Sequence, residues 1–188
     1  MTDFEFPVGV ILFVSLAMTV AAVIDGWKLK VPNCITFPFV LSGWAYHFWT
    51  GGFAAFGSSL LGTTLGLLLL LAPYAIGGMG AGDVKLFAGV GAWMGWQITL
   101  GAFCVSAVLG GVMAVAMVIY RGLRSGGWSK VAEHFQRFQL VGSELITIRD
   151  PNQLAALAAA RKPTAMLLPY GIPLALGTIG YFLWLGLL

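Results

Sequence analysis

The sequence predicts an all-α bundle of about six transmembrane helices, forming a single membrane-embedded domain over residues 1–188. Hydrophobic residues make up 59% of the chain and charged residues 9%, with a mean hydropathy of +0.91. An average soluble domain is about 25% charged, and one of this length could not bury so much apolar surface in a single core. No run alternates between polar and apolar residues with period 2, which disfavours a β-barrel.

The apolar residues fall into six segments, and each is interpreted as one helix. The segments cover about 7–24, 35–50, 57–76, 84–96, 98–120 and 167–188. Because a span needs about 20 residues, the second and fourth segments are short. We expect them either to be tilted or broken, or not to cross the full hydrocarbon thickness. The start of the chain, Met1–Glu5, is acidic and lacks the basic region of a signal peptide, so the first segment is expected to be a retained helix.

The basic residues set the expected orientation. All ten Lys and Arg fall in three alternate connections, about 25–34, 77–85 and 121–166. Since cytoplasmic loops carry the excess of Lys and Arg, we expect these three connections inside and both termini outside the cytoplasm. The membrane is expected to be the inner (cytoplasmic) membrane of the cell. The net charge of +3 reflects this bias and does not indicate nucleic-acid binding.

The stretch 121–166 is the one sizeable region outside the apolar segments. Apolar side chains recur at helical spacing at Trp128, Val131, Phe135 and Phe138. This pattern predicts an amphipathic helix lying in the membrane interface, and a loop with incidental aromatic residues is the alternative.

Two of the seven acidic residues are placed differently from the rest. Asp25 ends the first segment and Asp83 opens the fourth, so both are expected at the same depth on the cytoplasmic side. Ionisable residues at membrane depth are costly and tend to mark function. Structural alternatives remain: Asp83 could cap its helix, and Asp25 could pair with Lys28 or face lipid headgroups. The other five acids, Asp3, Glu5, Glu133, Glu144 and Asp150, are interpreted as solvated charge balance.

Two carboxyl groups held close together can catalyse peptide hydrolysis without a metal or cofactor. They share one proton, so one acts as base on a water molecule while the other donates to the peptide carbonyl. Competing chemistries lack their residues: there is no His-Glu-x-x-His motif, and Ser42 and His47 are not spaced to face each other on one helix. The two cysteines, Cys34 and Cys104, are isolated and predict neither a disulfide nor a zinc site.

Three blocks of sequence contain glycine, proline or acidic residues in distinctive patterns. The first is the Asp25 block, which runs through two lysines to Val31-Pro32-Asn33. The second is Gly80-Ala81-Gly82-Asp83 with Lys85, and the third is Pro169-Tyr170-Gly171-Ile172-Pro173. Together the blocks resemble the type IV prepilin peptidases: the second is similar to the family's GxGD signature, and the third to the stretch that opens the family's last helix.

This resemblance implies that Asp25 and Asp83 are the catalytic pair of an aspartic endopeptidase. The family cleaves the basic leader of prepilins and similar membrane proteins at the cytoplasmic face of the membrane. The residues that it implies around the site, as substrate-binding or site-shaping groups, are Gly80, Gly82, Lys85, Pro32, Asn33 and Pro169. Lys85 either orients Asp83 or faces anionic lipid. Larger members carry a Cys-x-x-Cys region that accompanies methyl transfer; this chain lacks the motif, so we expect no methyltransferase activity and a similarity to the short peptidases of tight-adherence pili or archaeal preflagellins.

Other classes compete with this interpretation. Intramembrane acids and broken helices also occur in a small proton-coupled transporter. A presenilin-like protease shares the GxGD motif, but its other aspartate follows a tyrosine, whereas Ile24 precedes Asp25 here. A structural scaffold would leave the matched aspartates unexplained. The expected partners are a prepilin-like substrate and the bilayer; the sequence does not determine the pilin or the oligomeric state.

Overall fold

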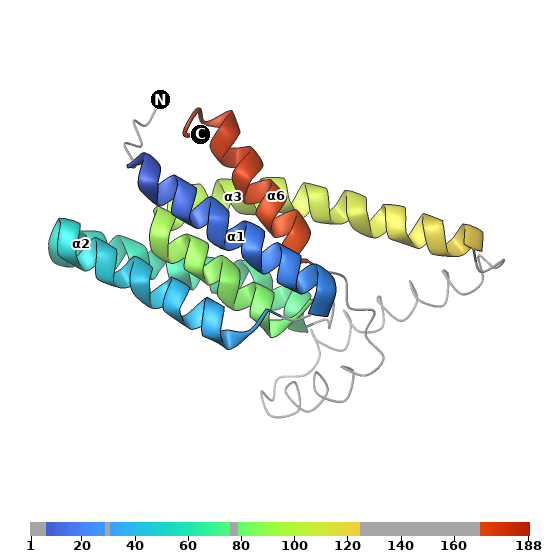
Figure 1. The fold of residues 1–188 in the computed structure, drawn as a ribbon, viewed down its shortest axis with the longest axis horizontal. Helices are drawn as coiled ribbons and strands as arrows, with labels where there is room; N and C mark the ends of the chain where they lie inside the picture. Colours follow the sequence, from blue (N-terminus) through green and yellow to red (C-terminus); the bar gives the residue numbers. More distant parts are fainter. Residues whose placement is uncertain (1–6, 29–30, 76–78, 125–169) are drawn as a thin grey trace.

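The computed structural model of the protein describes residues 7–28, 31–75, 79–124 and 170–188. These residues form four assigned helices: α1 (Val8–Lys28), α2 (Asn33–Ala75), α3 (Ala81–Arg124) and α6 (Gly171–Trp184) (Figure 1). No strand occurs within the described ranges. The predicted all-α class is therefore confirmed for this part of the chain. The predicted interfacial helix lies outside the described residues, except that α3 continues into its start as far as Arg124.

Helix α2 folds back on itself at Gly52. The backbone there is non-helical, with φ 62° and ψ −153°, a left-handed region in which glycine lacks the steric penalty of other residues. The indole Nε1 of Trp44 donates to Thr63 Oγ1 at 2.9 Å. In a straight helix these residues would be about 28 Å apart, so the two halves of α2 must lie antiparallel.

Helix α3 reverses in the same way at Gly95, where φ is 72°. The rings of Phe87 and Phe103 lie on opposite sides of this break with centroids 6.3 Å apart, against about 24 Å along a straight helix. Figure 1 shows the second half of α3, in yellow, projecting past the end of the bundle. The break at Gly52 falls between two predicted segments, whereas the break at Gly95 falls just inside the end of the predicted segment 84–96. The expected loops at 50–57 and 96–98 are helical apart from Gly52.

The three longer helices are long and apolar enough to cross a membrane. The candidate stretches are Val8–Trp27, Asn33–Ala75 and Ala81–Met117. Helix α6 has 14 described residues, Gly171–Trp184, and is shorter than the predicted segment 167–188. The chain is a membrane protein; the number of crossings and their orientation remain predictions.

Helix α1 is apolar on both of its faces, as expected for a helix between a protein core and lipid. One stripe is buried at helical spacing: Ile11, Val14, Met18, Ala21 and Asp25. The opposite stripe is exposed and also apolar: Leu12, Leu16, Val20 and Val23. The same periodicity that faces the core therefore carries Asp25 inward.

Glycines bring the backbones of α2 and α3 into contact. Gly62 packs directly on the Gly91 backbone, and a Cβ on Gly62 would lie 2.8 Å from the carbonyl carbon of Gly95. A Cβ on Gly66 would lie 2.8 Å from the Phe87 carbonyl oxygen. These close approaches leave the first half of α3 almost wholly enclosed, from Asp83 to Met94.

Candidate functional site

Asp25 lies in the last turn of α1, with its side chain 2% exposed. Its Oδ2 accepts a hydrogen bond of 2.9 Å from the backbone N–H of Gly171, the first residue of α6. A Cβ at position 171 would lie 2.9 Å from the Asp25 Cβ and 3.0 Å from Oδ2. Only glycine therefore lets the start of α6 approach this carboxyl group so closely.

Asp83 is the third residue of α3, and its side chain is also 2% exposed. Its Oδ2 accepts from the Gly80 N–H at 3.2 Å, while its own N–H donates to the Gly80 carbonyl at 3.2 Å. This reciprocal pair is a capping interaction at the first turn of a helix, where a carboxylate is favoured by the exposed N–H groups. Asp83 is therefore not the N-cap residue considered from the sequence, because α3 already begins at Ala81. It caps the helix from the third position instead, and this interaction occupies only one of its two carboxyl oxygens.

The two carboxyl groups lie close enough to interact electrostatically. Oδ1 of Asp83 is buried and has no hydrogen-bond partner among the described residues. A buried oxygen without a partner carries a desolvation cost unless water or a ligand satisfies it. Asp83 therefore presents a buried acceptor oxygen without a partner among the described residues, near a second carboxyl group.

The glycines of the Gly80–Asp83 block have different surroundings. A Cβ on Gly82 would lie 2.6 Å from the Val31 carbonyl oxygen, so this glycine allows the start of α3 to pack on the chain just before α2. A Cβ on Gly80 would have its nearest neighbour, Asp83 Oδ2, at 3.4 Å. Neither residue has positive φ. The space at Gly82 is therefore filled by Val31 of the chain itself.

Three of the remaining predicted residues, Lys85, Asn33 and Pro32, lie at or near the starts of α2 and α3. Lys85 Nζ donates to Asn33 Oδ1 at 3.0 Å and lies 4.8 Å from the centroid of the Phe37 ring. The carbonyl oxygen of Pro32 accepts from Ile35 N–H at 3.1 Å and so begins α2. Pro169 lies outside the described residues.

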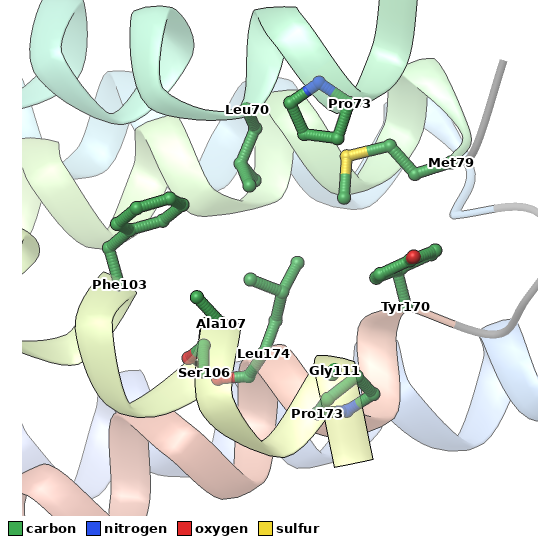
Figure 2. Close-up of a pocket in the computed structure, with 11 residues that line it drawn as sticks. Leu70, Pro73, Met79, Phe103, Ser106, Ala107, Gly111, Tyr170, Pro173 and Leu174 are labelled. Atoms are coloured by element: carbon green, nitrogen blue, oxygen red, sulfur yellow. Dashed lines mark hydrogen bonds between the residues drawn. The ribbon is translucent and has the colours of Figure 1, made fainter. Parts of the chain in front are cut away.

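An apolar pocket of about 250 Å³ adjoins the two backbone donors (Figure 2). Met79, which precedes Gly80, and Tyr170, which precedes Gly171, line one end, and Phe103 lines the other. The other lining residues shown are Leu70, Pro73, Ser106, Ala107, Gly111, Pro173 and Leu174. The pocket suits an uncharged, largely apolar group.

The sequence pattern alone did not predict that the Gly171 N–H is a partner of Asp25. Its signal was present in the Pro169–Pro173 block, because a glycine at the start of a helix can bring a free N–H to an acidic group. Ser42 and His47 do not form a catalytic pair, as expected from their spacing. Ser42 Oγ donates to the Phe39 carbonyl at 3.0 Å, and His47 Nε2 lies 2.9 Å from the Trp93 carbonyl oxygen.

Comparison with known proteins places these residues in a family. The model of the type IV leader peptidase family matches residues 12–115, which include both aspartates. The prepilin leader peptidase/N-methyltransferase of Pseudomonas aeruginosa is 31% identical over 131 residues, covering 65% of this chain and 44% of that protein. The Aeromonas hydrophila protein of the same description is 30% identical over 117 residues, covering 58% and 40%.

A third relative, the prepilin leader peptidase/N-methyltransferase of Neisseria gonorrhoeae, is 35% identical over 106 residues, covering 53% of this chain and 37% of that protein. The chain thus spans less than half the length of these curated relatives. No solved structure matches the chain. Because the family model covers more than half of the sequence, the chain belongs to the type IV leader peptidase family.

Proposed function

We propose that this chain is a membrane aspartic endopeptidase that removes the basic leader from prepilin or prepilin-like substrates. Cleavage takes place at the cytoplasmic face of the inner membrane, with Asp25 and Asp83 as the catalytic pair. The observation that carries the proposal is the meeting of two carboxyl groups, each 2% exposed, from two different helices of an apolar protein. Burying two acids together costs free energy, and a role of both carboxyl groups in peptide cleavage explains why the protein retains this arrangement.

The geometry supports a shared-proton mechanism. One carboxylate takes a proton from a water molecule, whose oxygen attacks the peptide carbonyl carbon, while the other carboxyl group donates its proton to the carbonyl oxygen. Collapse of this intermediate breaks the C–N bond, and the proton taken from water passes to the leaving nitrogen. The backbone donors Gly171 and Gly80 each hold an Oδ2, so both carboxyl groups are oriented before substrate arrives. The unpartnered Asp83 Oδ1 is a suitable position for the attacking water.

The surroundings suit a substrate anchored in the bilayer. The pocket beside the two glycine donors is apolar and can hold an uncharged side chain near the scissile bond. The exposed apolar stripe of α1, including Leu16 and Val20, keeps the site at the edge of the lipid. A leader peptide followed by a hydrophobic segment meets both requirements.

We further propose that the chain cleaves without methylating the new N-terminus. The curated relatives carry both activities in their description, but the 188 residues contain no Cys-x-x-Cys motif. Incubating cleaved prepilin and the purified chain with labelled S-adenosylmethionine tests this directly. Transfer of label to the cleaved product would overturn this part of the proposal.

The decisive experiment measures leader removal from a membrane-inserted prepilin by the native chain and by Asp25→Asn and Asp83→Asn. The amide retains the size and one acceptor oxygen of the carboxyl group but cannot take up or share the proton. We expect each variant to lose at least about a hundredfold in kcat, because general acid–base catalysis contributes about 10²–10⁴-fold.

Both variants must first be recovered from the membrane at native levels with an unchanged Tm. Gly57→Ala serves as the control variant, because Gly57 does not line the pocket and a Cβ at that position meets nothing within 4 Å. If a folded Asp25 or Asp83 variant cleaves at the native rate, that carboxyl group is structural, and a proton-coupled transporter becomes the better hypothesis.

A further inference from the structure

The two aspartates belong to helices that touch each other little. Helix α1 packs mainly on α6, whereas α3 packs mainly on α2 and α6. The hydrogen bond from Gly171 fixes Asp25 relative to α6. A second connection is needed to fix the start of α3, because Asp83 lies in its first turn, where a helix is least constrained by its own hydrogen bonds.

The chain just before α2 supplies one part of that connection. Val31 is 3% exposed, and its backbone packs on Gly82, the residue before Asp83. The same segment leads back along the chain to the end of α1 and thus to Asp25. A shift of Val31 would therefore change the position of the first turn of α3 relative to α1.

Lys85 supplies the other part. From Asp83 to Met94, Lys85 is the one residue that is not buried. Its ammonium does not extend freely into solvent: it donates to Asn33 Oδ1 at 3.0 Å and lies over the Phe37 ring. A hydrogen bond from a charged donor is stronger than a neutral one, and a cation over an aromatic face adds to it.

Resting on the proposed function, we propose that Lys85 and Asn33 form a clamp that positions Asp83 against Asp25. The clamp joins the first residue of α2 to the fifth residue of α3, next along both segments from the contact between Val31 and Gly82. Lys85 and Asn33 are positioning residues: they hold the helix that carries a catalytic group, and neither touches the reacting atoms.

The test compares kcat and KM for prepilin cleavage by the full chain in lipid vesicles. Lys85→Met and Asn33→Leu each remove one partner, Lys85→Arg and Asn33→Asp each retain the hydrogen bond, and Gln97→Met on the exposed surface of α3 is the control. We expect each disrupting variant to lower kcat about 10–100-fold, since a misplacement of about 1 Å can cost that much, with KM nearly unchanged. Lys85→Arg and Asn33→Asp should retain most of the native kcat.

The double variant Lys85→Met/Asn33→Leu should be no slower than the slower single variant, because both changes break the same interaction. Independent, multiplied losses would overturn the clamp. A raised KM with native kcat in Lys85→Met would instead make Lys85 a substrate contact. Lys85 would instead be a lipid contact if two results were found together. Asn33→Leu would have native kcat, and Lys85→Met would be slower only in vesicles that contain phosphatidylglycerol, not in pure phosphatidylcholine. Either result overturns the proposal.

Amide hydrogen exchange tests the clamp without any cleavage assay. In Lys85→Met, exchange should accelerate in residues 31–36 and 79–84, while Tm and the exchange of α6 stay native. Unchanged exchange in both segments would overturn the clamp whatever the activity. If Asp25→Asn and Asp83→Asn remain active while exchange does accelerate, the proposed function fails and the clamp stands as a property of the fold.

Discussion

At the scale of single residues, the site depends on how two buried carboxyl groups are satisfied. Each Oδ2 accepts one backbone N–H, from Gly171 or from Gly80. Backbone donors at helix starts suit this purpose because they are fixed by the fold and free of other partners. The glycines also permit the approach, at Gly171 by leaving room for Asp25 itself.

The glycines before Asp83 should differ in their tolerance of alanine. In Gly82→Ala the new Cβ would lie 2.6 Å from the Val31 carbonyl oxygen, so the first turn of α3 must move. In Gly80→Ala the nearest atom lies at 3.4 Å, an ordinary contact distance. We expect Gly82→Ala to lower kcat for leader cleavage at least about tenfold and Gly80→Ala to lower it less than about threefold.

Both variants are measured with the same prepilin and at matched membrane levels. Equal losses in the two variants would show that the motif acts through backbone flexibility, and not through the contact between Gly82 and Val31. A native rate for Gly82→Ala would remove that contact from the account of the site.

At the scale of elements, helix packing in this protein depends on small residues and on hydrogen bonds between helices. In lipid there is no hydrophobic drive between helices, so close backbone contact and interhelical hydrogen bonds carry more of the association. Ser59 Oγ donates to the Ala92 carbonyl, and Trp93 Nε1 donates to the Phe39 carbonyl at 2.9 Å. Both bonds connect α2 to α3, the helix that carries Asp83.

Gly62→Ala should destabilise the protein by this mechanism. The new Cβ would overlap the backbone of Gly91, where no flexible side chain can move aside. We expect a loss of about 1–3 kcal/mol in the free energy of unfolding, the usual range for overpacking. Thermal unfolding in detergent micelles provides the measurement, read as a fall in Tm.

Gly57→Ala is the matched control, because it lies in the same helix and its Cβ would meet nothing within 4 Å. It should leave Tm unchanged or slightly raised, since alanine favours helix more than glycine does. Equal destabilisation by the two substitutions would mean that α2 and α3 do not pack as closely as described.

At the scale of the whole molecule, three separate parts of the chain build the site. Helix α1 contributes Asp25, α3 contributes Asp83, and α6 contributes the Gly171 N–H. Their meeting ends lie together in Figure 1. If both termini lie outside, as the basic residues predict, this group of helix ends faces the cytoplasm.

Cysteine labelling tests this orientation. In a chain with Cys34→Ser and Cys104→Ser, single cysteines are introduced by Thr50→Cys, at the end opposite the aspartates, and by Ser129→Cys in the basic region 121–166. A membrane-impermeant maleimide added to intact cells should label the first variant readily and the second at least about tenfold less, because only the basic region is expected inside. After permeabilisation both should label.

The reverse pattern would place the aspartates outside and contradict cleavage at the cytoplasmic face. Labelling of both sites in intact cells would contradict the predicted number of crossings. Neither outcome would affect the contact between Asp25 and Gly171, so topology and site geometry are tested separately.

The composition and periodicity of the sequence by themselves determined the membrane environment and the helical class, and they predicted the two acids of the candidate site. Apolar runs of near-membrane length leave few structures other than helices, and the helical spacing from Ile11 to Asp25 already put that carboxyl group on one face of α1. The glycine-rich block before Asp83 and the block ending in Asn33 likewise stand in the sequence, as does the resemblance that they carry.

Tertiary structure decided how those parts meet. That Gly171 donates to Asp25, that Gly82 makes room for Val31 and that Lys85 reaches Asn33 all depend on contacts between residues far apart along the chain. Local sequence sets the period of a helix and the residues at its ends, but the crossing of two helices depends on the shapes of both surfaces at once. The site lies at such crossings, so the residues could be named from the sequence, while their partners required the fold.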